Sequence, residues 1–209
     1  MKMTINEIKT ELDKLDRFPQ YRALAKKIAK EDYKYFLDNC PMDSFKFKIL
    51  YGYTLGYAKD DIDTLLGYFE SFIQYVDDWA VCDTFCQSFK IARKEQEKVF
   101  ELLMKYKDTS DEFESRVVSV MLLSHYLNDK YIDEVIQVLD KLYDGEYYAM
   151  MGTAWALATV MAKYPDKCLE YLKSDVNISD KTYNKALQKC RESFRVSDEI
   201  KLWTKTVKK

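Results

Sequence analysis

Glycine and proline are scarce in this chain, whose 209 residues include five glycines and three prolines. Tight turns, hairpins and phosphate-binding loops depend on these residues, so the chain has room for few of them. No dinucleotide-binding or P-loop fingerprint occurs in the sequence. These absences disfavour sheet-rich folds and enzymes that hold a nucleotide on a glycine-rich loop.

Metal-binding residues are also sparse, since His125 is the only histidine. The five cysteines are scattered through segments of helical periodicity and follow no signal peptide, which is typical of free thiols in a reducing cytoplasm. Cys82 and Cys86 would share a helix face, but the lack of a second cysteine pair disfavours a zinc or iron–sulfur site. We therefore expect a cytoplasmic protein without a metal, with a structural His125 and cysteines that act as small apolar fillers. The cysteines are Cys40, Cys82, Cys86, Cys168 and Cys190.

No long hydrophobic run is present. The longest stretch without a charged residue covers the sixteen residues 147–162. A helix needs roughly 20 apolar residues to span a bilayer. This run predicts a buried helix, and we expect no membrane contact.

The chain also lacks an excess of basic residues, with 33 Lys and Arg against 35 Asp and Glu. Its net charge of −2 and its sequence pI near 5.6 argue against general affinity for DNA, because binders of duplex DNA usually carry a basic excess. A local basic stripe remains compatible with these totals. One basic cluster, at the C-terminus, is more typical of a solvated tail. It consists of Lys201, Lys205, Lys208 and Lys209.

Helical periodicity is what the sequence has in abundance. Apolar residues recur at steps of three and four through about twelve segments, which predicts an all-α protein. The last segment is expected to break near Val196 and Ser197. The segments are approximately 4–15, 19–30, 32–39, 43–59, 61–76, 79–91, 94–106, 111–128, 131–142, 147–163, 166–173 and 179–207.

The helices repeat at regular intervals. Those beginning near residues 43, 79, 111, 147 and 179 are each separated by one shorter helix. Such spacing is typical of an α-solenoid, and the consensus of tetratricopeptide repeats is absent. We predict one HEAT-like superhelical domain over residues 1–209, made of about six helix pairs, with one helix of each pair lining a concave face. Gly52 and Gly56 should let a neighbouring helix approach closely.

Trp79 and Asp83 are the most informative pair of side chains. In a helix, residues four apart share a face, so an aromatic ring and a carboxylate would face the same partner. The more common interpretation of such residues is structural, with the tryptophan in the core and the aspartate solvated.

Residues on successive lining helices would meet on the concave face. Two tryptophans, a carboxylate and basic side chains together would form an unusual site. The residues expected there are Trp79, Asp83, Arg116, Tyr148, Trp155, Lys185 and Lys189.

Four ordered segments resemble a known family. They are DDWAVCD at 77–83, ESRVVSVMLL at 114–123, the stretch from Tyr147 to Ala156, and the stretch from Asn184 to Val196. From about residue 18 to its end, the chain is similar to the DNA alkylation repair family of AlkD-like HEAT-repeat alkylpurine DNA glycosylases.

The resemblance implies excision of N3- and N7-alkylated purines from duplex DNA, with the base left in the duplex. It implies that Trp79, Asp83 and Trp155 face the deoxyribose of the lesion and that Arg116 lies near the DNA backbone. Tyr148, Lys185 and Lys189 complete the expected DNA-binding surface. A carboxylate would stabilise the sugar cation, and no metal or cofactor is required.

The chain departs from the family at several positions. Asp78 stands where an asparagine is common, Ala158 where an arginine is usual, and Met150 where a basic residue is frequent. The resemblance also implies that the chain begins near the family's second helical pair. The departures keep a second hypothesis open, a non-catalytic helical-repeat module with weak or no DNA affinity and a protein partner on its concave face. A basic groove favours the enzyme, and a neutral or acidic groove favours the module.

Overall fold

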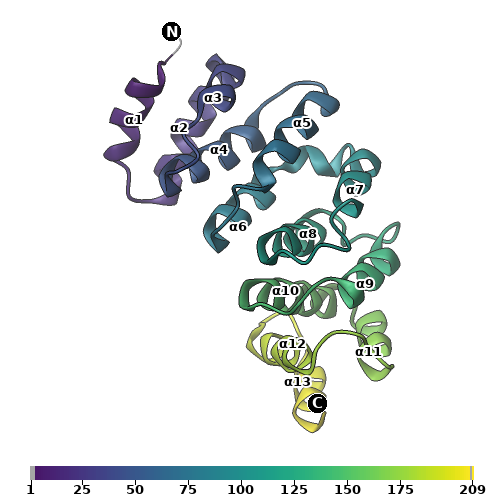
Figure 1. Cartoon of the computed structure of the whole chain (residues 1–209). Helices are drawn as coiled ribbons and strands as arrows, with labels where there is room; N and C mark the ends of the chain where they lie inside the picture. Colours follow the sequence, from purple (N-terminus) through teal and green to yellow (C-terminus); the bar gives the residue numbers. More distant parts are fainter. Residues whose placement is uncertain (1–2, 208) are drawn as a thin grey trace. The chain divides into compact units, whose positions relative to one another are not determined.

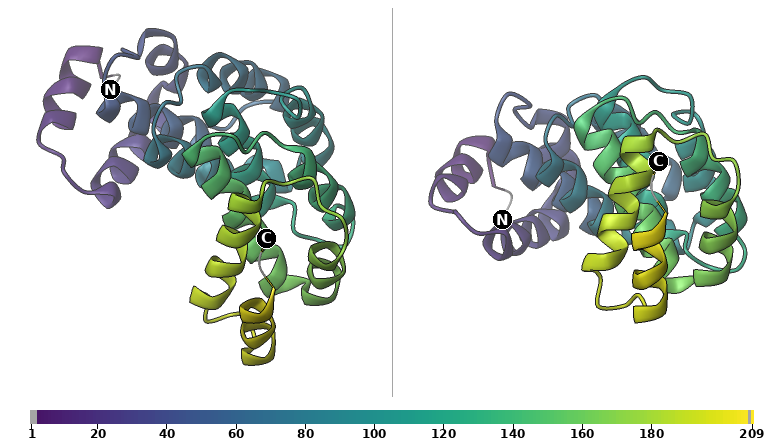
Figure 2. Two further views of the ribbon diagram at one scale, coloured as in Figure 1. Left: turned by 60° about the horizontal axis from the view of Figure 1, so that its bottom comes forward. Right: turned by 90° about the horizontal axis from the view of Figure 1, so that it is seen from below.

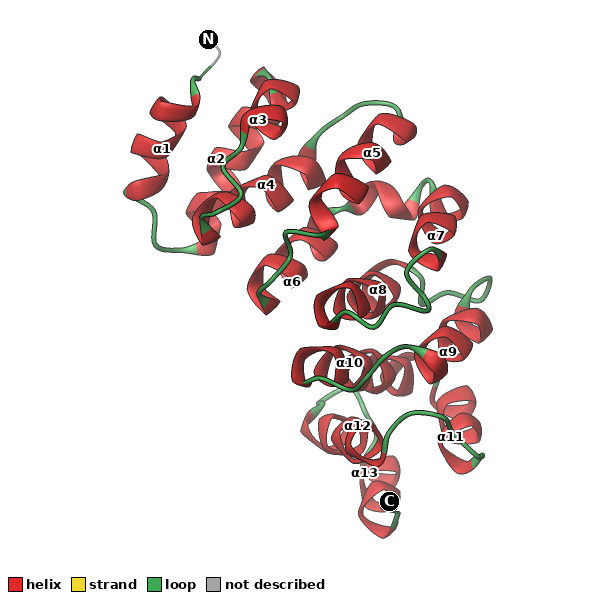
Figure 3. Ribbon diagram, viewed as in Figure 1, coloured by secondary structure: helices red, strands yellow, loops and turns green. Residues whose placement is uncertain are grey.

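The protein is seen here in a computed structural model that describes residues 3–207 and 209. Lys208, part of the expected basic tail, lies outside the described residues. Over the described range the chain forms thirteen α-helices and one short 3₁₀ helix, with no strand (Figure 3). The predicted all-α helical-repeat fold class is confirmed.

The described chain divides into two compact units, one ending at Leu102 and the other beginning at Leu103. The boundary falls inside α7 (Gln96–Met104). The single domain expected over 1–209 stays a prediction.

The first unit is built around a row of three helices, in which α4 packs against α2 and against α6 (Figure 1). An aromatic cluster fills its core, with the Tyr51 and Phe72 rings stacked at 4.4 Å and Phe85 edge-on to Phe72 at 5.2 Å. Its elements before α7 are α1 (Ile5–Asp13), α2 (Phe18–Glu31), α3 (Tyr33–Asn39), α4 (Phe45–Tyr57), α5 (Ile62–Ile73), α6 (Trp79–Ser88) and the 3₁₀ helix η1 (Lys90–Arg93).

The second unit repeats this plan, because α10 packs against α8 and α12. The short helix α13 packs on α12, beside which it lies in Figure 2. The charge-free run 147–162 forms most of α10 and is largely buried, as predicted. Nowhere in the described chain is a helix long and apolar enough to cross a membrane. The helices are α8 (Glu112–His125), α9 (Ile132–Lys141), α10 (Tyr147–Lys163), α11 (Pro165–Lys173), α12 (Asp180–Glu192) and α13 (Asp198–Thr206).

The predicted repeat of helix starts is confirmed. The helices α4, α6, α8, α10 and α12 begin at residues 45, 79, 112, 147 and 180. The expected break near Val196 and Ser197 falls between α12 and α13. The sequence did not predict η1, which follows a turn at Phe89 with φ −75° and ψ 60°.

Two glycines set the distance between α4 and α6. A Cβ atom on Gly52 would lie 2.8 Å from the Phe85 Cβ, and one on Gly56 would lie 2.6 Å from the Ser88 Oγ and 2.7 Å from the Ser88 carbonyl carbon. No side chain fits at such distances, so the predicted packing role of both glycines is confirmed. In the second unit, a Cβ atom on Gly152 of α10 would lie 2.5 Å from the Ser119 Oγ on α8.

The five cysteines are free thiols, as predicted. Four are buried and Cys40 is partly exposed; the Sγ atoms of Cys82 and Cys86 lie 4.0 Å apart. His125 is buried at the end of α8, as expected of a structural residue. Among the described residues, no group of three or more His, Cys, Asp or Glu side chains could hold a metal ion.

Alanine at Gly56 and at Gly67 should have opposite effects on stability. Helix propensity favours alanine by about 1 kcal/mol at either position. At Gly56, overpacking against the Ser88 backbone costs about 1–3 kcal/mol and should outweigh this gain. The Cβ of Gly67→Ala meets nothing within 4 Å, so this variant should be stabilised by up to about 1 kcal/mol.

Urea unfolding of the two variants measures both effects in the same unit. Equal changes in the free energy of unfolding would contradict the close contact between Gly56 and Ser88.

Candidate functional site

Two acidic residues anchor the start of α6. The Asp78 carboxylate caps the helix and accepts a hydrogen bond from the Ala80 backbone N–H at 2.7 Å. The Asp77 carboxylate accepts a hydrogen bond from the Nζ of Lys48, a buried lysine of α4, at 2.6 Å. The acidic pair therefore fixes the position of Trp79, the first residue of α6.

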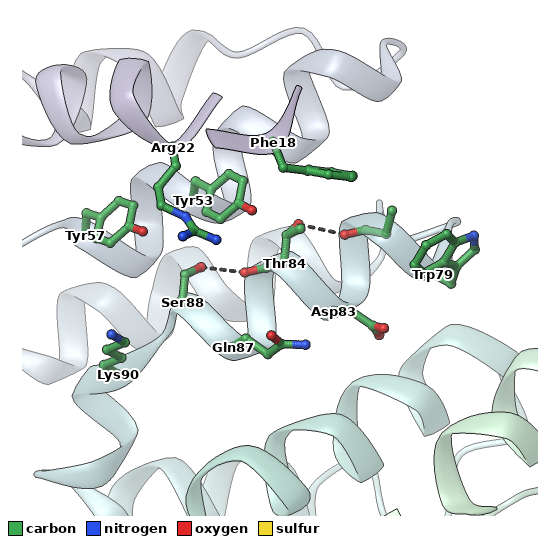
Figure 4. A pocket seen from close by; sticks show the side chains of 11 residues that line it. Phe18, Arg22, Tyr53, Tyr57, Trp79, Asp83, Thr84, Gln87, Ser88 and Lys90 are labelled. Atoms are coloured by element: carbon green, nitrogen blue, oxygen red, sulfur yellow. Dashed lines mark hydrogen bonds between the residues drawn. The ribbon is translucent and has the colours of Figure 1, made fainter. Parts of the chain in front are cut away.

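A pocket of about 420 Å³ lies between α2, α4 and α6 of the first unit (Figure 4). We call it the α6 pocket. It combines aromatic, cationic and carboxylate side chains. It is lined by Phe18, Arg22, Tyr53, Tyr57, Trp79, Ala80, Asp83, Thr84, Gln87, Ser88 and Lys90.

Trp79 and Asp83, which were expected to share a helix face, both line the α6 pocket. The Trp79 side chain is 48% exposed, which is unlike a core tryptophan. Asp83, one turn later, is partly exposed. An indole and a carboxylate are thus available together at the N-terminal half of α6.

Sequence reasoning missed the α2 and α4 walls of this pocket. The Arg22 guanidinium lies 5.5 Å from the centre of the Tyr53 ring, and the interaction with Tyr53 raises the pKa of Arg22. The Tyr53 and Tyr57 rings are stacked, with centroids 6.3 Å apart and planes 6° apart. Phe18 and Arg22, like Tyr53 and Tyr57, are four residues apart, so their spacing indicates a shared helix face within each pair but not that these faces turn toward α6.

Trp155 lines a smaller pocket of about 190 Å³ in the second unit, together with Lys189. We call it the Trp155 pocket. Ala158 and Arg195 are also part of its lining. The structure thus brings together two of the predicted residues, Trp155 and Lys189. Trp79 and Asp83 belong to the other unit, and the expected convergence of Trp155 with them stays a prediction.

A third pocket, of about 590 Å³, has α12 as one wall. We call it the α12 pocket. No carboxylate lines it, and Tyr147 at its edge is 60% exposed. Lys185 was predicted, whereas Tyr147, Lys181 and Arg191 were missed. The lining comprises Tyr147, Met150, Lys181, Asn184, Lys185, Leu187, Gln188 and Arg191.

Lys181, Lys185 and Lys189 recur at every fourth residue of α12, which places them on one face of the helix. Lys181 and Lys185 line the α12 pocket and Lys189 lines the Trp155 pocket. The second unit therefore carries a local basic stripe despite the net charge of −2.

The structure corrects the predicted position of Arg116. It was expected on the surface of a groove, but it is 6% exposed and its Nη1 donates a hydrogen bond to the Tyr148 carbonyl oxygen at 3.0 Å. Gly152 lets α10 approach α8 so closely that the arginine is covered. Tyr148 is half-buried against Arg116, and it lines none of the three pockets named above.

Comparison with known proteins gives one match. The profile of a family described as "DNA alkylation repair enzyme" matches residues 17–192, well over half of the chain. Neither the curated proteins nor the solved structures give a match.

Arg116→Met should reduce stability rather than surface charge. The variant removes the hydrogen bond to Tyr148 but keeps an apolar stem, and hydrogen bonds to charged groups contribute about 1.5–3 kcal/mol. We expect a loss of about 1–3 kcal/mol in the free energy of unfolding, measured by urea titration. Arg195→Met, at an exposed arginine of the same unit, should change it by less than about 0.5 kcal/mol. Equal stability of the two variants would contradict a structural role for Arg116.

Proposed function

The chain belongs to the DNA alkylation repair enzyme family, and we propose that it excises N3- or N7-alkylated purines from DNA. Family membership supports the role in DNA alkylation repair. The observation that carries the finer proposal is the α6 pocket, where a half-exposed Trp79 and the Asp83 carboxylate line one cavity.

The chemistry of the lesion suits a carboxylate. An alkylated purine is positively charged and already a good leaving group, so the barrier lies mainly in the cationic sugar that forms as the glycosidic bond breaks. In the proposed reaction Asp83 stabilises this oxocarbenium ion and positions the attacking water. The glycosidic electrons leave with the purine, and the water supplies the new C1′–O bond and loses a proton.

Indole rings add to this stabilisation. A desolvated cation over the face of a tryptophan gains roughly 1–2 kcal/mol. Trp79 has the exposure needed to meet a sugar. We propose the same role for Trp155, which is partly exposed in its own pocket.

The basic stripe on α12 supports binding to a phosphate backbone. The proposed DNA-binding residues are Lys185 and Lys189, joined by Lys181 and Arg191. The Trp155 pocket lacks the family's arginine at Ala158, but Lys189 and Arg195 bring two cations to the same cavity. The acidic Asp78 caps α6, so its carboxylate already has a partner in the backbone.

Asp83→Asn tests the reaction. Asparagine keeps the size and hydrogen bonding of the side chain but removes the charge that opposes the sugar cation. The loss of one such contact costs roughly 2.7–4 kcal/mol, so we expect base release from duplexes containing 7-methylguanine or 3-methyladenine to fall about a hundred- to a thousandfold. Duplex affinity and thermal stability should stay near those of the wild type.

Asp78→Asn is the matched control. It removes a carboxylate five residues away, and asparagine caps a helix as well as aspartate does. This variant should therefore keep its activity. Base release by wild-type protein equal to that in buffer would refute the glycosylase and favour the non-catalytic binding module.

A further inference from the structure

We infer that Arg22 and Lys90 form a phosphate subsite in the α6 pocket, which holds the backbone of the lesion strand and sets its register against Trp79 and Asp83. The inference deepens the proposed function and rests on it. The ligand is a phosphodiester group of a DNA strand.

The two cations lie at one end of the pocket. Lys90 follows the C-terminal end of α6, whereas Trp79 begins that helix. Figure 4 shows Arg22 reaching from α2 toward α4 and α6, on the same side of the pocket as Tyr57 and Lys90, with Trp79 at the opposite side. The cavity thus has a cationic end and an indole–carboxylate end.

Arg22 is held in place for this role. Its guanidinium lies 5.5 Å from the centre of the Tyr53 ring in a cation–π contact, and a guanidinium is always charged. Arg22 is nevertheless exposed. A planar guanidinium fixed on an aromatic ring retains donors that match two phosphate oxygens.

Lys90 is the second cation of the proposed subsite. Its side chain is exposed and makes no hydrogen bond or ion pair with any residue the structure describes. The one carboxylate in the pocket lining is Asp83, on the middle of α6. Two cations around a cavity fit an anion, and the Tyr53 and Tyr57 rings form the wall beside them.

The dimensions fit a strand of DNA. With a rise of about 1.5 Å per residue, Ser88 lies about 8 Å along α6 from Asp83 and about 14 Å from Trp79. Each strand of a duplex carries one phosphate per about 3.4 Å of helix axis, so for a duplex whose axis runs along α6 the span corresponds to two to four nucleotides. A phosphate bound by Arg22 and Lys90 would therefore lie a few nucleotides from the sugar that faces Asp83.

The test is a scan of single phosphates. One strand of a duplex carries a tetrahydrofuran abasic analogue, and its phosphates are replaced, one at a time, by neutral methylphosphonates up to five positions on either side. Binding is measured for wild type, Arg22→Met and Lys90→Met. We expect wild type to lose roughly tenfold in affinity at one or two positions. Each variant keeps one of the two cations, so it should show a lower affinity that the same substitutions reduce by clearly less than tenfold.

Lys26→Met is the matched control. Lys26 lies one turn after Arg22 and has a similar contact, 5.3 Å from the centre of the Tyr57 ring, but it does not line the pocket. It should keep the wild-type profile over the whole scan. Arg22→Lys should recover part of the affinity, which a purely structural defect in Arg22→Met would not explain. Lys90→Met keeps the test decisive if Arg22→Met is unstable.

The results separate this inference from the proposed reaction. A methylphosphonate effect that is smaller in both variants than in wild type supports the subsite, even if wild type releases no base. A scan in which both variants lose as much affinity as wild type at the same positions overturns the subsite, even if base release is normal. Lack of any duplex binding by wild type overturns it as well.

Discussion

The contact between α4 and α6 is the constraint on which the rest of the first unit depends. Gly52 and Gly56 bring the backbone of α6 within reach of α4, with Ser88 against Gly56 at one end of the helix. The ion pair between Lys48 and Asp77 holds the other end. Because α6 is fixed at both ends, its exposed face is a rigid platform, as a binding or catalytic site requires. A helix held only at one end would leave the indole and the carboxylate free to shift.

The second unit uses the same packing with a different chemical result. Gly152 gives α10 and α8 their close contact, and Arg116 is enclosed there rather than offered to a ligand. The cations of α12 line the pockets instead, where Lys181 is exposed and Lys185 and Lys189 are partly exposed on the same face of the helix. The two units therefore share the spacing of their helices but differ in the chemistry of their surfaces. The α6 pocket of the first unit combines aromatic and charged side chains, whereas the second unit has a row of lysines on α12.

The sequence was sufficient for the helices and for part of the site. Periodicity predicted every α-helix, because amphipathic segments of this length have few alternatives once glycine and proline are rare. The spacing of Trp79 and Asp83 also gave their common face. It could not give the wall formed by Arg22 and Tyr53, because that wall depends on which faces of α2 and α4 turn toward α6. Such a choice is made by tertiary packing.

The error at Arg116 has a different origin. Its neighbours Val117, Val118 and Val120 are all fully buried, and a helix that is apolar around most of its circumference belongs in a core. This signal was present in the sequence and argued against a surface arginine. Similarity to a family indicated a residue of functional interest there, but it did not indicate the solvent exposure.

The burial of four of the five cysteines lowers the reactivity of their thiols toward alkylating agents. Agents that alkylate DNA bases are electrophiles, and they also attack thiolates. Burial raises the pKa of Cys190 to about 12 and raises the pKa of Cys168 as well, so both remain neutral thiols, which are poor nucleophiles. Cys82 and Cys86 are fully enclosed. These four buried cysteines therefore offer little sulfur chemistry to the same reagents that create the family's substrates, and Cys40 is the partly exposed thiol.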